Sequence, residues 1–202
     1  GVRAPKLEHA RLERRAGRDL EPLRADSDAA YEGELSFTVD GLRPVIAVPH
    51  LPTNVVPVAS EGVLGREFNS AFIGSCSNGR LEDYRAGVRA LKAAGGKVHP
   101  GVRLTVTPST HEVAMRMLEE GLYEAYMSAG AMVTNDEREQ TLNQPLCTIG
   151  HHGVLAPGDV LLSTSNRNFE GKLGRGGEIY LASPATVAAS AARGTITDPA
   201  DL

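Results

Sequence analysis

Two cysteines are the residues with the widest chemical range in this chain. Cys76 follows the apolar run SAFIGS, and Cys147 lies in LNQPLCTIGHHGVLAPG, a stretch of turn residues that indicates a loop. The residues alone leave three interpretations open. Each cysteine is a small buried hydrophobe, the two hold a metal ion or cluster, or one is a reactive thiol paired with His151 or His152.

A second group of polar residues stands where apolar runs end. Asn78 and Arg80 follow the run at 70–75, while 107–110 and 163–167 hold similar residues after two further runs. An amide and a guanidinium can bind a substrate carboxylate or a cofactor. Because Asn-Gly is also an ordinary turn sequence, both interpretations of Asn78 and Arg80 stand.

Helical and apolar patterns indicate the elements that position these residues. Apolar side chains recur at helical spacing from Leu81 to Leu91. Ser109 with Glu112 forms a capping box that opens a helix over 109–122, and Ser183 before Pro184 opens a third helix. Apolar runs predict strands at 70–75, 103–108, 131–135, 159–165 and 178–183.

Strands that alternate with helices favour right-handed crossovers and a parallel sheet. We therefore expect an α/β fold in three layers, with a mostly parallel sheet and helices on both faces. In such a sheet the binding site lies outside the carboxyl ends of the strands. The polar residues described above gather at those ends.

Composition limits the classes of function. The 202 residues carry a net charge of -4, with 4% aromatic residues and no tryptophan, so nucleic acid is not an expected partner. No apolar stretch has the roughly 18 residues of a membrane span. Two cysteines cannot build a disulfide scaffold, which makes the cytoplasm the default compartment. The expected ligand is a small molecule.

The first 40 residues differ from the rest. LEHARLERRAG is charged nearly all round, which is typical of a helix that rests on a partner rather than in a core. From residue 41 the apolar pattern strengthens, beginning with the proline-punctuated run RPVIAVPHLPTNVVPV, which indicates short extended segments. We therefore expect a partner-contacting extension at 1–40 and an α/β domain at 41–202.

Three longer strings resemble a known family. FIGSCSNGRLEDYRAG, CTIGHHGVLAPGD and STSNRNFEGKLGRGGEIYLASPATVAASAARGTITDP are similar to the large subunit of the aconitase superfamily, and most like its isopropylmalate isomerase and homoaconitase branch. The resemblance covers about residues 25 to 202, in the same order and with similar spacing. It implies an α/β domain of the kind that holds the iron–sulfur cluster in this family.

The resemblance also implies a reaction and its site. Members of the family hold a 4Fe-4S cluster with three cysteines, and they dehydrate and rehydrate a hydroxy polycarboxylate such as isopropylmalate, homocitrate or citrate. Cys76 matches the first cluster ligand, Cys147 the last, and Asn166 an asparagine beside the cluster. Arg167 matches an arginine that binds a substrate carboxylate, and Lys172 stands where the family has a second such arginine.

Two positions depart from the family pattern. Gln144 stands where the family has the other cysteine of a CxxC pair. A neutral amide is a poor iron ligand, because thiolate is both softer and charged, and His152 is more simply a solvated loop residue than a replacement. Lys172 keeps the charge of arginine but lacks its planar fork. The resemblance therefore implies a cluster with one ligand missing, and no catalytic residue is identified.

Two hypotheses follow. Family large subunits are longer than this chain, and their N-terminal half and a small subunit supply further groups, which implies a component of a multi-chain hydro-lyase. The end of the chain resembles the natural end of microbial large subunits, so we expect half of a split subunit or a remnant. The alternative is a cluster-free relative, either a structural or regulatory subunit or an iron-independent hydro-lyase acting on another hydroxy acid.

Overall fold

The computed structural model describes residues 13, 16–19, 21, 25–75, 78–134 and 154–202. The chain divides into two units, Gly1–Asp40 and Gly41–Leu202. In the first unit, residues 25–40 form neither helix nor strand. The backbone there makes a turn in which the Ala29 amide donates to the carbonyl of Asp26 at 3.1 Å.

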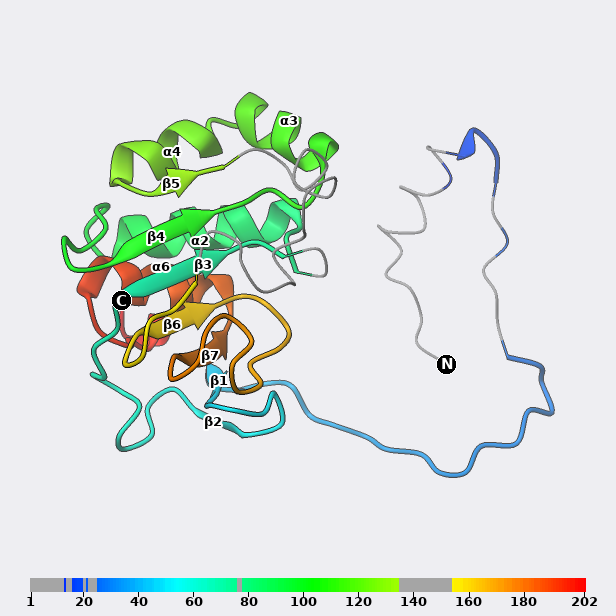
Figure 1. Ribbon diagram of the computed structural model, residues 1–202. Helices are drawn as coiled ribbons and strands as arrows, with labels where there is room; N and C mark the ends of the chain where they lie inside the picture. The colour runs from blue at the N-terminus through cyan, green and yellow to red at the C-terminus, as the bar shows by residue number, and fades with distance from the viewer. Residues whose placement is uncertain (1–12, 14–15, 20, 22–24, 76–77, 135–153) are drawn as a thin grey trace. The chain divides into compact units, whose positions relative to one another are not determined.

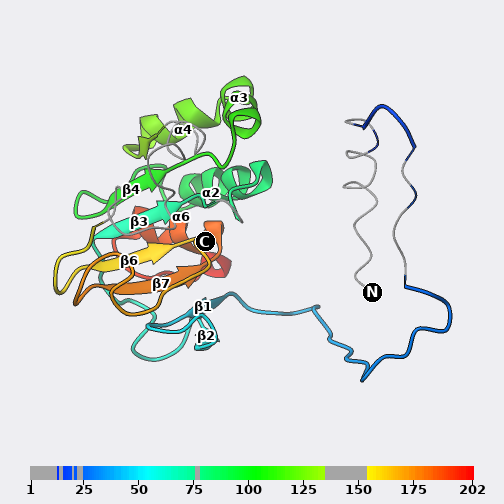
Figure 2. The same ribbon diagram turned by 45° about the vertical axis from the view of Figure 1, so that its right-hand side comes forward.

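Among the described residues, the second unit is built on a seven-stranded sheet (Figure 1, Figure 2). In sheet order the strands are β2 (Val55–Pro57), β1 (Val45–Ala47), β7 (Glu178–Ala182), β6 (Val160–Ser163), β3 (Ser70–Ile73), β4 (Arg103–Val106) and β5 (Met132–Val133). The last five run parallel to one another, while β1 is antiparallel to both β7 and β2. The mostly parallel sheet expected from the sequence is confirmed.

The register brings the carboxyl ends of the central strands side by side. Phe72 of β3 pairs with Thr105 of β4 on one side and with Ser163 of β6 on the other. The three strands end within one residue of this row, at Ile73, Val106 and Ser163. The loops that follow therefore leave the sheet from one edge, where ligands bind in parallel sheets.

The described helices are α2 (Leu81–Ala93), α3 (His111–Glu119), α4 (Leu122–Ala129) and α6 (Pro184–Arg193), followed by the 3-10 helix η1 (Pro199–Asp201). α6 begins as the sequence predicts, because the Ser183 hydroxyl accepts from the Thr186 amide at 3.2 Å and Pro184 opens the first turn. Among the described residues, none of the helices has the length and apolar character that crossing a membrane requires.

The start of α3 differs from the prediction. Its N-cap is Thr110, whose hydroxyl accepts from the Val113 amide at 3.2 Å. The hydroxyl of Ser109 instead donates to the carbonyl of Gly79, in the loop after β3. The capping box centred on Ser109 is therefore wrong by one residue, and Ser109 ties two loops together instead.

The helix expected over 109–122 is also divided. α3 stops at Glu119, and α4 starts at Leu122. Gly121 between them has a φ of +68°, in the left-handed region that breaks an α-helix and favours glycine. The chain can turn there, and both helices reach the same core.

Two hydrophobic clusters cover the two faces of the sheet. The larger joins Ile73 and Leu162 to side chains from all four described α-helices. The smaller joins Phe72 to Leu155 and Leu173, which belong to loops. Successive strand residues face opposite sides of a sheet, so helices pack on one face. On the other face the described residues supply loops, and the helices expected there are not among them.

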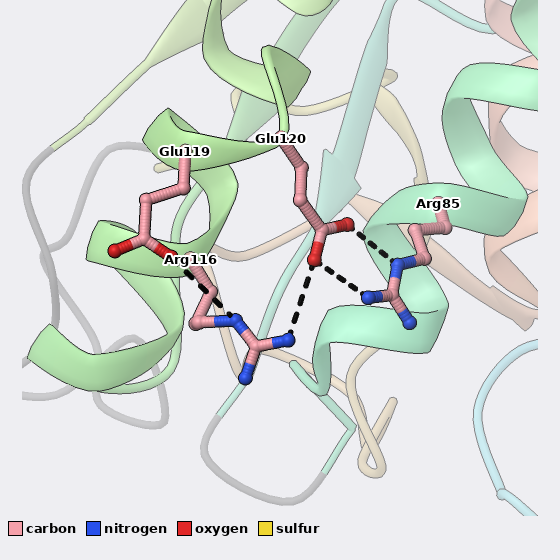
Figure 3. Close-up of polar contacts among 4 residues, drawn as sticks. All are labelled: Arg85, Arg116, Glu119 and Glu120. Carbon is pink, nitrogen blue, oxygen red and sulfur yellow. Dashed lines mark hydrogen bonds and ion pairs between the residues drawn. The ribbon is translucent and has the colours of Figure 1, made fainter.

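A cluster of charged side chains joins α2 to the end of α3 (Figure 3). Arg85 on α2 donates from Nε and Nη2 to the two carboxylate oxygens of Glu120, at 2.7 and 2.6 Å. Arg116 lies 3.5 Å from the same carboxylate and 3.8 Å from that of Glu119. The hydrogen bonds from Arg85 lower the pKa of Glu120 and raise the pKa of Arg85 itself.

Candidate functional site

Three loops meet at the carboxyl edge of the sheet. Their described residues are 74–75 and 78–80 after β3, 107–110 after β4, and 164–172 after β6. The sequence places its candidate substrate-binding residues in the first and third of these loops.

Thr164 joins the loops after β6 and β3. Its hydroxyl accepts from the Gly74 amide and donates to the Gly74 carbonyl, both at 2.9 Å. The Thr164 carbonyl in turn accepts from Nδ2 of Asn78 at 2.6 Å. Thr164 is buried and Asn78 is exposed, so this amide fixes the loop and also borders open space.

The loop after β4 packs against the same glycine. A Cβ atom at Gly74 would lie 2.5 Å from the carbonyl oxygen of Thr107, and the φ of Gly74 is +155°. Tyr84, fully buried on α2, donates its hydroxyl to that carbonyl at 2.6 Å. Only glycine therefore allows the two loops to approach this closely.

Ser75 has an unusual backbone for its residue type. Its φ is +94°, in the left-handed region that residues with a side chain seldom adopt. The residue is 1% exposed, and its hydroxyl has no hydrogen-bond partner among the described residues. A strained, buried serine thus immediately precedes Cys76 in the chain.

An open pocket of about 370 Å³ lies beside these loops. It is lined by Asn78, Arg80, Asp83, Thr164, Ala182, Ser183 and Pro184. The Arg80 amide donates to Oδ2 of Asp83 at 3.0 Å. Burial raises the pKa of Asp83, and the hydrogen bond from the Arg80 backbone opposes that shift.

Arg167 lies in the loop after β6 with its side chain exposed, next to the exposed Asn166. Within the described part of the chain, neither Arg167 nor Arg80 forms an ion pair. The carboxyl edge of the sheet therefore carries two guanidinium groups that form no ion pair with a described carboxylate, although Asp83 lies close enough to Arg80 for their charges to interact. Such groups attract anions, and a guanidinium matches a carboxylate in shape.

Two buried side chains hold the loop of Arg167 through hydrogen bonds to main-chain carbonyls. Asn168 is 0% exposed, and its Nδ2 donates to the carbonyls of Val48 and Ile179 at 3.1 and 3.2 Å. Lys172 is 2% exposed, and its Nζ donates to the main-chain carbonyl of Arg167 at 3.0 Å. The predicted contact of Lys172 with substrate stays a prediction, and this hydrogen bond is what the structure adds.

The predicted metal ligands lie outside the described residues. This holds for Cys76 and Cys147, and also for Gln144, His151 and His152. In the described part of the chain, no group of three His, Cys, Asp or Glu side chains is arranged to hold a metal ion.

Comparison with known proteins gives the family. The model of the aconitase family (aconitate hydratase) matches residues 3–194. The chain belongs to the aconitase family. The 3-isopropylmalate dehydratase large subunit 1 of Methanopyrus kandleri is 46% identical over 189 residues, which cover 93% of this chain and 43% of that protein.

Two further aconitase-family relatives agree. The 3-isopropylmalate dehydratase large subunit 2 of Archaeoglobus fulgidus is 44% identical, over 91% of this chain and 42% of its own length. The 3-isopropylmalate dehydratase large subunit of Oleidesulfovibrio alaskensis is 46% identical, over 92% and 42%. The chain thus spans less than half the length of these curated relatives, and the resemblance seen in the sequence is confirmed.

Sequence reasoning missed the residues that hold the loops together. Thr164, Asn168 and Tyr84 make long-range contacts that join separate strands and helices. No local spacing shows these contacts. The only indication in the sequence is that Thr164 and Asn168 lie close to Arg167, in a polar string at the end of a strand.

Proposed function

We propose that this chain supplies the carboxylate-binding part of a hydro-lyase, which dehydrates and rehydrates a hydroxy polycarboxylate in an assembly with other chains. The observation that carries the proposal is Arg167, an exposed guanidinium without a described ion-pair partner on a loop fixed by buried hydrogen bonds. The names of the relatives support 3-isopropylmalate as the substrate class. The predicted cytoplasmic setting stays a prediction.

The chemistry explains why a fixed guanidinium helps. Removing water from a hydroxy acid requires loss of a proton next to a carboxylate and departure of the neighbouring hydroxyl. As the proton leaves, negative charge accumulates on the oxygens of that carboxylate. A guanidinium already in place stabilises this charge without reorganising. In the proposal, Arg167 holds one carboxylate of the substrate in this way.

The pocket beside the loops gives Asn78 and Arg80 their proposed role. Both line the same cavity as Thr164, and a polycarboxylate has a second acid group to be bound. Arg80 supplies a second cation, and Asn78 supplies a fixed amide at its border. Asn166, next to Arg167 in the chain, keeps its proposed place beside the cofactor site.

The two cysteines limit what this chain can contribute to a cofactor site. The aconitase family generally carries a 4Fe-4S cluster, and iron acting as a Lewis acid would help a hydroxyl to leave. The whole sequence of this chain holds two cysteines, whereas iron–sulfur clusters are held by sets of cysteine thiolates. These residues do not fit a three-cysteine site, so we attribute no step of the reaction to a cluster held by this chain alone.

The partners are also a proposal. The relatives are named large subunits, which implies a small-subunit partner, and more than half of their length has no counterpart here. We propose that this missing part and a small subunit complete the site and supply the base that takes the proton. The extension at 1–40 is the proposed contact region.

The alternative is a cluster-free relative with a structural or regulatory role, or an iron-independent hydro-lyase. The presence of Gln144 in place of a ligand cysteine favours it. Both functions allow the chain to bind a hydroxy acid, and they differ in whether the assembled protein needs iron.

Substitution of Arg167 tests the proposed site. Arg167→Ala should weaken binding of 3-isopropylmalate or citrate about 10- to 100-fold, because it removes a charge-assisted hydrogen bond worth roughly 1.5 to 3 kcal/mol. Titration calorimetry measures the affinity. Arg175→Ala is the matched control, because Arg175 is an exposed arginine near the same loop. Equal affinity of Arg167→Ala and the unaltered chain would remove the proposal's main support.

A further inference from the structure

Lys172 is a cationic side chain that the fold keeps away from solvent. It is 2% exposed, while Asn166 and Arg167, at the start of the same loop, are exposed. Its Nζ lies 3.0 Å from the carbonyl oxygen of Arg167. A hydrogen bond from an ammonium group is stronger than a neutral one, because the charge assists it.

A tight turn of the backbone brings Lys172 close to the main chain of Arg167. The Lys172 amide donates to the carbonyl of Phe169 at 3.2 Å, which closes a four-residue turn. Gly171, the third residue of that turn, has a φ of +75°, as type II turns require. The chain therefore reverses between Arg167 and Lys172, and the lysine side chain reaches the peptide that carries the arginine.

Both ends of this turn are attached to the core. Asn168 holds the first end through the carbonyls of Val48 and Ile179. At the other end, the Leu155 amide donates to the Leu173 carbonyl at 2.6 Å, and both leucines belong to the smaller hydrophobic cluster. Lys172 lies between these two attached ends, and its ammonium group bonds to the Arg167 carbonyl.

We propose that Lys172 is a positioning residue, which affects carboxylate binding by holding the main chain of Arg167 and not by touching the ligand. The inference rests on the proposed function of Arg167 in carboxylate binding. It differs from the role that the resemblance implies, in which Lys172 contacts a substrate carboxylate itself.

The first test needs no ligand. Arg167–Asn168 is the only Arg-Asn pair in the sequence, so 13C-carbonyl arginine with 15N-asparagine labels the Arg167 carbonyl alone in a carbonyl–amide NMR spectrum. Lys172→Met should move this signal upfield, as loss of a hydrogen bond to a carbonyl does. Arg175→Met is the charge-matched control and should leave it unchanged. An unmoved signal in folded Lys172→Met overturns the proposal.

The second test is a double-mutant cycle with citrate as the probe. Lys172→Met should weaken citrate binding about tenfold in the unaltered chain, and less than about twofold in the Arg167→Ala chain, because a residue that acts through Arg167 has no effect without it. An equal tenfold loss in both backgrounds would establish direct contact and overturn the proposal.

A third measurement covers the case in which Lys172→Met does not fold. The sequence holds four lysines, so Lys6→Arg, Lys92→Arg and Lys97→Arg identify the Lys172 signals by elimination. Citrate should shift the guanidinium signal of Arg167 at least about threefold more than the terminal methylene signal of Lys172, and the reverse order would overturn the proposal. If the unaltered chain does not bind citrate, carboxylate binding by this chain on its own is wrong, while the citrate-free carbonyl signal still decides whether Lys172 holds the main chain of Arg167.

Discussion

The hydroxyl of Thr164 bonds to both backbone groups of Gly74, and through them it holds the loop that leads to Cys76. Both residues are buried, so water cannot replace these bonds if the hydroxyl is removed. A glycine is required at the other side of the contact, because the Thr107 carbonyl leaves no room for a side chain. The arrangement of these loops therefore depends on two hydrogen bonds and on one position without a side chain.

Thr164→Val should lower the free energy of unfolding by about 2 to 6 kcal/mol, because it leaves two buried backbone groups without a partner and each costs roughly 1 to 3 kcal/mol. Urea denaturation of the chain measures this change. Thr164→Ser keeps the hydroxyl and should retain most of the stability. If valine and serine variants are equally stable, the hydroxyl does not join the two loops.

At the scale of elements, the ion pairs of Figure 3 tie α2 to the end of α3. The two helices come from different strand–helix units, so the bond between Arg85 and Glu120 spans 35 positions in the sequence. The groups are near the surface, where salt screens them and each pair contributes little.

Glu120→Gln should cause a small loss of thermal stability at neutral pH, and that loss should shrink at high salt. The pKa of Glu120 is lowered in the folded protein by the hydrogen bonds from Arg85. Its stabilising effect is therefore present above the ordinary value of 4.5 and is lost as the pH falls through the lowered value. Melting curves of both proteins across this range should converge at acid pH. A constant difference would mean that the carboxylate charge is not the cause.

At the scale of the whole molecule, the proposed carboxylate site lies at one edge of the sheet and takes two cations from this chain. Arg80 and Arg167 border the carboxyl edge of the sheet, while two cysteines are all that the sequence offers to iron. The matched part of the relatives is less than half of their length. In the proposal, groups outside these residues complete the site.

Anaerobic treatment of the isolated chain with iron and sulfide should not give a stable 4Fe-4S cluster, because two thiolates leave the ligand set incomplete. Gln144→Cys, which restores a third thiolate, should retain more iron and sulfide per chain and show the visible absorbance of a cluster. Iron and sulfide assays make the comparison. A full cluster in the unaltered chain would show that Gln144 is no obstacle.

Local patterns were sufficient for the strands of the central sheet and for two helices. The face of α2 that carries Leu81, Tyr84, Val88 and Leu91 is buried as its spacing predicts, and Ser183 caps α6. These features depend on residues within a few positions of one another. The start of α3 was missed by one residue because Ser109 bonds to Gly79, a contact 30 positions away.

By itself, the amino-acid sequence determined the α/β class, the family and the string in which Arg167 lies. Periodicity, capping and long matched strings are properties of neighbouring residues, and they need no third dimension. Only the tertiary structure decided that Thr164 bonds to Gly74 and that Lys172 lies buried beneath the Arg167 carbonyl. A lysine in a loop is ordinarily solvated, and it takes the fold to place the ammonium group against the backbone five residues earlier.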